Sequence, residues 1–171
     1  AYVSHAAENT TSFAGGDGTA GNPYKISTPA HLYNVRNYLN NANVYFVLLN
    51  DIVFTPQHFD DDPDNQNAGE DFFNYGYGWD PIGNSNTGNY FKGVFDGGNY
   101  TIKGLYIKRN RWDLSCAGLF GYNQGTIKNL TVSDIALEGE SGGNIGSVAG
   151  INAGTITNCT NTSDITIHRS Y

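Results

Sequence analysis

The sequence contains no methionine, only two cysteines, and only nine lysine and arginine residues among 171. With 16 acidic residues the formal net charge is −7, which argues against general nucleic-acid binding, because phosphate neutralisation needs clustered lysine and arginine. No apolar run is long enough to span a bilayer as a helix. The absence of an initial methionine and of a signal peptide leads us to expect a segment of a larger protein.

Charged residues make up only 15% of the chain, whereas glycine occurs 22 times and tyrosine 12 times. This composition is typical of a β-rich chain with many turns and excludes an ordinary helical bundle. We expect one domain over residues 1–171. Residues 1–43 would form a lead-in strand and a capping helix, and residues 44–171 would form stacked coils.

Three segments of the chain are similar to one another: Gly93–Ile107, Gly118–Val132 and Ser147–Asn161. They align without gaps at shifts of 25 and 29 residues. Each contains short strands broken by glycine and asparagine, with no room for a helix. Because such a unit cannot bury its apolar face alone, it must stack on its neighbours. The pattern therefore predicts an all-β fold, a right-handed parallel β-helix, with the hand taken from the usual chirality of parallel crossovers.

The alignment also predicts which residues lie above one another in the stack. Asparagines at turns should form ladders, because asparagine tolerates a left-handed backbone and its amide can bond to an equivalent amide. The predicted columns are Ile102, Ile127 and Ile156; Leu105, Leu130 and Cys159; Val94, Leu119 and Val148; Thr101, Thr126 and Thr155; Asn123 and Asn152; and Asn129 and Asn158.

One short helix is predicted near the start of the chain. Thr28 is suited to cap it and Pro29 to occupy its first position. Leu32, Val35 and Leu39 then follow at helical spacing. A single amphipathic helix beside a β-helix is expected to close its open end, since an exposed sheet edge invites aggregation.

Several segments resemble the GLUG-motif repeat proteins: FAGGDGTAGNPYKISTPAHLYNVRNYL, LLNDIVF, WDPIG, FKGVFDGGNYTIKGLYI and GLFGYNQGTIKNL. The resemblance extends from Phe13 to Ile167. Proteins of this family are secreted or surface-anchored bacterial proteins, and similar segments accompany immunoglobulin A-cleaving metallopeptidases and candidate adhesins. The resemblance implies a β-solenoid at a bacterial cell surface. The family has no agreed catalytic residues, so none is transferred to this chain.

An acidic stretch follows the most apolar strand. Its carboxylates occupy positions 1, 3, 5 and 12 of a calcium-loop-like spacing and comprise Asp60, Asp62, Asp64 and Asp71. Calcium takes 6–8 oxygen ligands from carboxylates and carbonyls, so this spacing predicts a Ca²⁺ site. However, Asn65 replaces the usual glycine at the sixth position and Pro63 intervenes. A solvated acidic loop remains the alternative.

Aromatic residues gather beside the same stretch. For the phenylalanines we favour a satellite core beneath the loop. Tyr75, Tyr77 and Trp112 lie in polar or glycine-flanked loops and are the candidate ligand-binding residues, since exposed rings stack on sugars or fill a partner's pocket.

No catalytic constellation is evident. Glycoside hydrolysis needs two carboxyl groups at a defined separation. The candidate acids do not align in pairs across the repeats; they are Asp51, Asp80, Asp96, Asp134 and Asp164. We therefore expect a non-catalytic extracellular module for adhesion or ligand presentation, which binds a host or environmental protein or glycan and works beside the rest of its parent chain. The alternatives are a glycan-active β-helix enzyme and an ancillary domain of a secreted peptidase.

Overall fold

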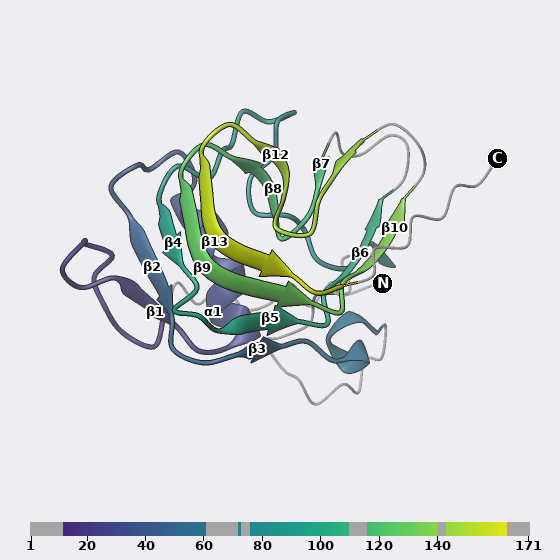
Figure 1. Cartoon of the computed structure of the whole chain (residues 1–171), viewed down its shortest axis with the longest axis horizontal. Helices are drawn as coiled ribbons and strands as arrows, with labels where there is room; N and C mark the ends of the chain where they lie inside the picture. Colours follow the sequence, from purple (N-terminus) through teal and green to yellow (C-terminus); the bar gives the residue numbers. More distant parts are fainter. Residues whose placement is uncertain (1–11, 61–71, 73–75, 110–115, 140–142, 164–171) are drawn as a thin grey trace, which may run out of the picture.

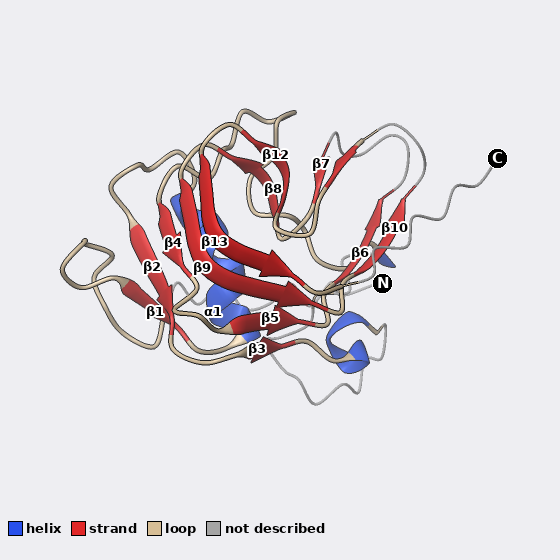
Figure 2. Cartoon of the chain, in the orientation of Figure 1, coloured by secondary structure: helices blue, strands red, loops and turns tan. Residues whose placement is uncertain are grey.

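A computed structural model describes residues 12–60, 72, 76–109, 116–139 and 143–163 of the chain. Strands predominate, and the helical segments of these ranges are short (Figure 2). In chain order the elements are β1 (Tyr24–Ile26), α1 (Pro29–Asn34), the 3-10 helix η1 (Val35–Tyr38), β2 (Tyr45–Leu48), β3 (Ile52–Val53), the 3-10 helix η2 (Pro56–Phe59), β4 (Val94–Asp96), β5 (Thr101–Lys103), β6 (Tyr106–Arg109), β7 (Cys116–Ala117), β8 (Phe120–Asn123), β9 (Thr126–Ser133), β10 (Ala136–Gly139), β11 (Asn144–Ile145), β12 (Ala149–Asn152) and β13 (Thr155–Asn161).

Every pair formed between these strands is parallel in the described part of the chain. The largest sheet has the order β1-β2-β4-β9-β5-β3, with β13 paired to β9. Within the described ranges there are three further sheets of two strands each: β10-β6, β11-β7 and β12-β8. Figure 1 shows successive passes of the chain laid side by side around a shared interior. The prediction of a mostly β structure with parallel sheets and one short helix near its start is confirmed.

The longest strand, β9, turns a corner in the middle. Its first half pairs with β4 and its second half pairs with β5. Between the halves, Asn129 has a φ of 53°, in the left-handed region that asparagine tolerates better than most residues. The corner allows Ile127 and Leu130, three positions apart, both to point into the core instead of following strict alternation. One strand therefore lines two faces of the interior.

The predicted register is confirmed between the last two repeats. Ile156 of β13 lies opposite Ile127 of β9, and Cys159 lies opposite Leu130. On the neighbouring strand pair, Asn152 lies opposite Asn123.

The predicted register is wrong between the first two repeats. Ile102 lies opposite Val132, whereas Phe95 lies opposite Ile127. The Gly93–Ile107 segment contains β4, β5 and the start of β6, but the Gly118–Val132 segment contains β8 and most of β9. The two segments are therefore similar in sequence because they share turn residues. They cover different parts of two successive circuits of the chain and do not lie above one another.

Two other predicted columns change for the same reason. Val94 lies opposite Thr126 rather than Leu119, and Thr101 lies opposite Thr131. Pairing is decided by the residues that fill the interior, and Phe95 and Ile127 are both fully buried. Of the aromatic side chains in the described ranges, five large ones are fully buried: Phe46, Trp79, Phe91, Phe95 and Phe120.

The predicted helix is present but shorter than its apolar spacing suggested. The Thr28 hydroxyl caps α1 by accepting a hydrogen bond from the His31 backbone N–H at 3.2 Å, and Pro29 occupies the first position. The helix buries Leu32 and then tightens into η1. Leu39 has extended backbone, so it does not continue the helix. Among the described residues, no helix has the length and apolar character needed to cross a membrane.

The corrected stacking predicts unequal effects of two alanine substitutions. Ile127→Ala should lower the free energy of unfolding by about 2–5 kcal/mol, because Ile127 is fully buried between Phe95 and Ile156. Ile156→Ala should cost clearly less, since Ile156 is only half-buried in the last layer. Urea denaturation of the two variants tests this. Equal losses would mean that the outer side of Ile156 is covered as well as that of Ile127.

Candidate binding surface

The predicted calcium site falls mainly outside the described residues. Asp62, Asp64 and Asp71 all lie there, whereas Asp60 directly follows η2 and is half-buried. The described residues contain no cluster of three or more metal-ligating side chains. The calcium site therefore stays a prediction.

Of the three candidate aromatic residues, the structure describes Tyr77; Tyr75 and Trp112 lie outside the described ranges. Tyr77 is half-buried, and its backbone carbonyl accepts a hydrogen bond from the Lys108 N–H at 2.8 Å. The next residue, Gly78, has a φ of 68°, and an added Cβ would collide with the Tyr106 carbonyl oxygen. Tyr77 is therefore attached to β6 by backbone contacts. Strand β6 also meets the segment before Asp60, since the Phe59 and Tyr106 rings lie 6.0 Å apart.

Phe72, the one residue of 61–75 that the structure describes, is buried as predicted, but it belongs to the main core and not to a separate satellite core. Phe72 is buried and packs against Phe54 and Trp79, with ring centroids 5.5 and 5.8 Å away. Trp79 is fully buried, and its indole N–H donates to the Leu119 carbonyl at 3.1 Å. Neither Phe72 nor Trp79 is available to a ligand.

Each described member of the candidate acids is held by a structural contact. Asp51 accepts a hydrogen bond from the Thr101 N–H at 2.8 Å, and Asp134 pairs with Lys103 at 3.2 Å. Asp80 accepts from the Arg36 guanidinium at 2.8 Å, and that guanidinium lies 3.6 Å from the Tyr33 ring centroid.

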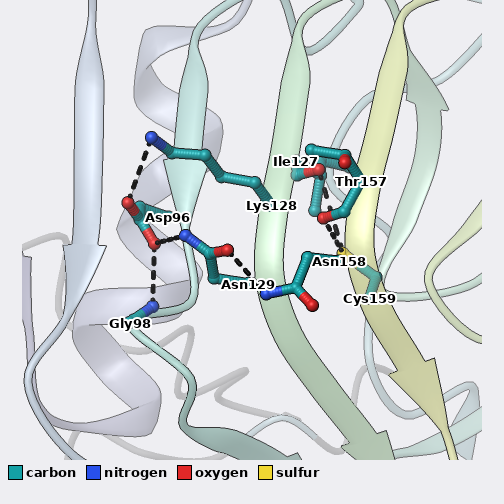
Figure 3. Close-up of polar contacts among 8 residues, drawn as sticks. All are labelled: Asp96, Gly98, Ile127, Lys128, Asn129, Thr157, Asn158 and Cys159. Carbon is teal, nitrogen blue, oxygen red and sulfur yellow. Dashed lines mark hydrogen bonds and ion pairs between the residues drawn. The ribbon is translucent and has the colours of Figure 1, made fainter.

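Asp96 caps a turn and anchors an amide ladder (Figure 3). Its Oδ1 accepts from the Gly98 N–H at 2.9 Å and from Asn129 Nδ2 at 3.0 Å, while its Oδ2 pairs with Lys128 Nζ at 3.2 Å. Asn129 Oδ1 in turn accepts from Asn158 Nδ2 at 2.8 Å. We call Asp96, Asn129 and Asn158 the Asp96 ladder. The predicted contact between the two asparagines is confirmed, but the sequence did not reveal that a carboxylate anchors it.

The environment of Asp96 favours its charged form. Burial raises the pKa of the Asp96 carboxyl, but the hydrogen bonds from Gly98, Asn129 and Lys128, together with the Lys128 charge, outweigh burial. The net effect is a pKa below the ordinary value of 3.8. This carboxylate is therefore suited to accepting hydrogen bonds and unsuited to acting as a general acid near neutral pH.

A second amide ladder starts inside the molecule. Asn123 is fully buried; its Oδ1 accepts from the Gly125 N–H at 3.0 Å and its Nδ2 donates to Asn152 Oδ1 at 2.7 Å. Asn152 repeats the arrangement, with Oδ1 accepting from the Gly154 N–H at 3.3 Å. We call Asn123 and Asn152 the Asn123 ladder.

Cys159 lies beside the Asp96 ladder and donates its thiol to the Thr157 carbonyl, with Sγ and oxygen 3.3 Å apart (Figure 3). Burial raises the pKa of this thiol, and the backbone hydrogen bonds only partly oppose that effect. Because the thiolate is the reactive form, Cys159 has the properties of a packing residue rather than a nucleophile.

A threonine-rich surface lies on the outer side of β5, β9 and β13. The sequence alignment placed Thr126 opposite Thr155 correctly but misplaced Thr101. Strand pairing places Thr101, Thr131 and Thr160 in one column and Thr126 and Thr155 in another. Those on β13 are exposed, and those on β5 and β9 are half-buried. We call this surface the threonine face; its members are Thr101, Thr126, Thr131, Thr155, Thr157 and Thr160.

Comparisons with known proteins give two relatives and one similar structure. The chain is 38% identical over 161 residues to the "Putative Gly-rich membrane protein" of Evansella cellulosilytica, covering 92% of this chain and 16% of that protein. It is 34% identical over 147 residues to "Halomucin" of Haloquadratum walsbyi, covering 85% of this chain and 1% of that protein. The chain thus spans only a small part of these relatives.

The similar structure is the crystal structure of a "putative immunoglobulin A1 protease" from Bacteroides ovatus. It matches with a TM-score of 0.52 and 17% identity, over 88% of this chain and 50% of that chain. At this identity the match shows a similar fold only. No protein-family model matches the chain, so the resemblance to GLUG-motif proteins stays a prediction.

The calcium prediction can be tested by melting the protein with and without the ion. If the acidic stretch binds Ca²⁺, millimolar Ca²⁺ should raise the melting temperature and a chelator should lower it, since binding to the folded state alone stabilises it. The quadruple variant Asp60→Asn, Asp62→Asn, Asp64→Asn and Asp71→Asn is the control and should not respond. A wild-type melt that is unchanged by Ca²⁺ would leave the solvated acidic loop as the explanation.

The contacts of Asp96 predict a specific pH dependence. A carboxyl whose folded pKa is lowered stabilises the fold above its unfolded pKa, and this stabilisation is lost as the pH falls through the folded value. Asp96→Asn should therefore lower the free energy of unfolding by about 1 kcal/mol at pH 7. The difference from wild type should shrink below about pH 4.

The control for this experiment is Asp134→Asn. Its ion pair with Lys103 is solvent-exposed on both sides, so its loss should change stability little at any pH. Denaturant titrations between pH 2.5 and pH 7 provide the measurement. If Asp96→Asn lowered the free energy of unfolding equally at every pH, the charge of Asp96 would not be the source of its stabilising effect.

Proposed function

We propose that the chain is a right-handed parallel β-helix module, closed at its start by α1, which presents a non-catalytic binding surface outside a bacterial cell. The observation that carries the proposal is the stacking of parallel strands with apolar residues inside and small polar residues outside. Ile127, Leu130 and Val132 of β9 are buried, whereas the outward residues of the same strand are half-buried. Such a stack is a rigid support for residues on its surface and loops.

Two parts of the surface are suited to bind a protein or glycan ligand. The first is the loop surface beside β6, with Tyr77 and, outside the described ranges, Tyr75 and Trp112. Aromatic rings combine a flat apolar surface with a polar group, which suits them to sugars and to protein partners. The second is the threonine face, whose repeated hydroxyl groups can donate and accept hydrogen bonds. The same threonines also stabilise neighbouring strands as β-branched residues.

The extracellular assignment is supported by the relatives. The two relatives are named "Putative Gly-rich membrane protein" and "Halomucin", and the chain matches a small part of each. A segment that occurs within much longer proteins is expected to act as a module beside other parts of its parent chain. We therefore propose a secreted or surface-attached parent protein of the GLUG-repeat type.

An ancillary role beside a peptidase is the second candidate. The observation in its favour is the similarity of fold to half of the chain named as an immunoglobulin A1 protease. In that role the module would position a catalytic domain elsewhere in its parent chain. A glycan-cleaving activity is less well supported, because each described candidate acid is engaged separately in a structural contact.

The proposal predicts measurable binding by the isolated chain. The chain should bind members of an array of glycans and extracellular proteins without cleaving them. Tyr77→Ala should weaken that binding about tenfold or more, which corresponds to roughly 1.4 kcal/mol, and Tyr77→Phe should largely retain it because the ring remains. The same comparison applies to Tyr75 and Trp112, with phenylalanine as the conservative replacement.

A separate variant tests the threonine face. Thr155→Val, Thr157→Val and Thr160→Val together remove three exposed hydroxyl groups but keep the β-branched shape. Loss of binding in this variant alone would assign the ligand to the threonine face. Absence of binding to every array member would contradict the binding role, and release of shortened glycans would favour the enzyme alternative.

A further inference from the structure

The last strand pair leaves one side of the stack open within the described residues. Strand β13 pairs with β9, and β12 pairs with β8, but neither has a second paired strand among those residues. Ile156 and Cys159, which continue the inward columns, are half-buried, whereas Ile127 and Leu130 beneath them are buried. We call the outer side of β12 and β13 the β13 edge. An exposed strand edge of this kind is a template for another strand.

The hydrogen bonds of the two amide ladders run in opposite directions, so that at the β13 edge one ladder ends in an acceptor and the other in a donor. In the Asp96 ladder, Asp96 is ionised and can only accept, so Asn129 must turn its Nδ2 toward Asp96 and its Oδ1 toward Asn158. Asn158 therefore donates inward, and its Oδ1 accepts no hydrogen bond within the described part of the chain. The Asp96 ladder ends in an unused acceptor.

The Asn123 ladder ends differently. The Gly125 and Gly154 N–H groups each fix an asparagine Oδ1, so Asn123 donates outward to Asn152. Among the residues that the structure describes, the Asn152 Nδ2 makes one contact, with the Gly154 carbonyl at 3.3 Å. An amide nitrogen carries two hydrogens, so the Asn152 end of the ladder presents a donor to the β13 edge.

A glycine column lies between the two ladders. The Thr126 N–H donates to the Gly93 carbonyl at 2.9 Å, and the Thr155 N–H donates to the Gly125 carbonyl at 2.8 Å. A Cβ on Gly125 would collide with the Gly93 oxygen, and a Cβ on Gly154 would collide with the Gly125 oxygen. Each further segment added here therefore needs a glycine at this position. The residue after that glycine needs a backbone N–H that can donate to the glycine carbonyl of the preceding segment.

We propose that the β13 edge binds a further parallel segment with the pattern Asn-x-Gly-Thr-Ile-x-Asn, so that the edge selects its neighbour by hydrogen-bond direction. The first asparagine of the segment accepts from Asn152, and the second asparagine donates to Asn158. The glycine allows close approach to Gly154, and the isoleucine covers Ile156. This pattern already occurs twice in the chain, as Asn123–Asn129 and Asn152–Asn158.

A second copy of the protein does not fit this edge as well. On the opposite side of the main sheet, the outer edge of β1 is covered, because the Ala14 N–H donates to the Lys25 carbonyl and the Lys25 N–H donates to the Gly15 carbonyl, both at 2.8 Å. The other terminal strand, β3, is only two residues long and cannot match the seven residues of β13. Head-to-tail stacking of two molecules therefore lacks a matching open edge. Two copies could also meet through their β13 edges, related by a two-fold axis perpendicular to the strands. The two β13 strands would then run antiparallel, whereas strands β1 to β13 pair only in parallel within the described ranges.

The experiment extends the full chain by repeating residues 143–163 directly after Tyr171. The added Asn152 and Asn158 then follow the originals by the same 29 positions that separate Asn123 from Asn152 and Asn129 from Asn158. We expect the urea midpoint to rise. Hydrogen exchange of residues 155–161 should slow at least tenfold relative to the unextended chain, because β13 becomes an internal strand.

Two matched extensions test the hydrogen-bond directions. In the first, aspartate replaces the asparagine that repeats Asn158 in the extension. Its carboxylate presents only acceptors to the original Asn158 oxygen, so the additional protection from hydrogen exchange should be lost. Aspartate in place of the added Asn152 still accepts from the Asn152 amide, so protection should be retained. Each change adds one negative charge, which makes the two variants controls for each other.

Three results would overturn the proposal. The first is rapid exchange of residues 155–161 in the extended chain, equal to that in the unextended chain. The second is equal protection in both aspartate extensions. The third is protection of residues 155–161 in the unextended chain to the level of β9, which would show that the β13 edge is already covered.

Discussion

The left-handed backbone corner at Asn129 and Asn158 is the constraint on which the main sheet depends. Their φ angles are 53° and 51°, and the two residues lie in adjacent layers. Without the corner, strict alternation would turn Leu130 away from the interior that Ile127 already faces. The same corner divides the threonine face into two planes and brings the asparagine amides within 2.8 Å of each other. Core, surface and ladder thus share one backbone requirement.

The sequence predicts this geometry well only where consecutive passes have the same length. Between β9 and β13, every paired residue differs by the same 29 positions, so a gapless alignment is also a spatial alignment. Between β4 and β9, Phe95 pairs with a residue 32 positions later. Glycine and the Thr-Ile pair recur at several turns of the chain. An alignment based on residue identity alone therefore placed β5 beside the wrong part of β9.

The candidate surface could be predicted only in part for a related reason. Burial of Phe72 follows from its apolar character, and the Asp-Gly sequence at Asp96 correctly indicates a turn. That Asp96 also receives the Asn129 amide depends on the spatial register of distant segments, which residue spacing did not reveal. The Thr101 column was misplaced together with Ile102, since adjacent residues on a strand share one register.

The order of strand pairing has a consequence for how the molecule is made. In each pair of named strands one member precedes the other, and β13 is added last to a sheet whose other members are already in place. The segment before β1 closes the first edge with residues that are synthesised even earlier. A chain that emerges amino end first, from a ribosome or through a secretion pore, therefore offers each arriving strand a finished template. Folding can advance layer by layer at the rate of delivery, without waiting for distant carboxyl-terminal sequence.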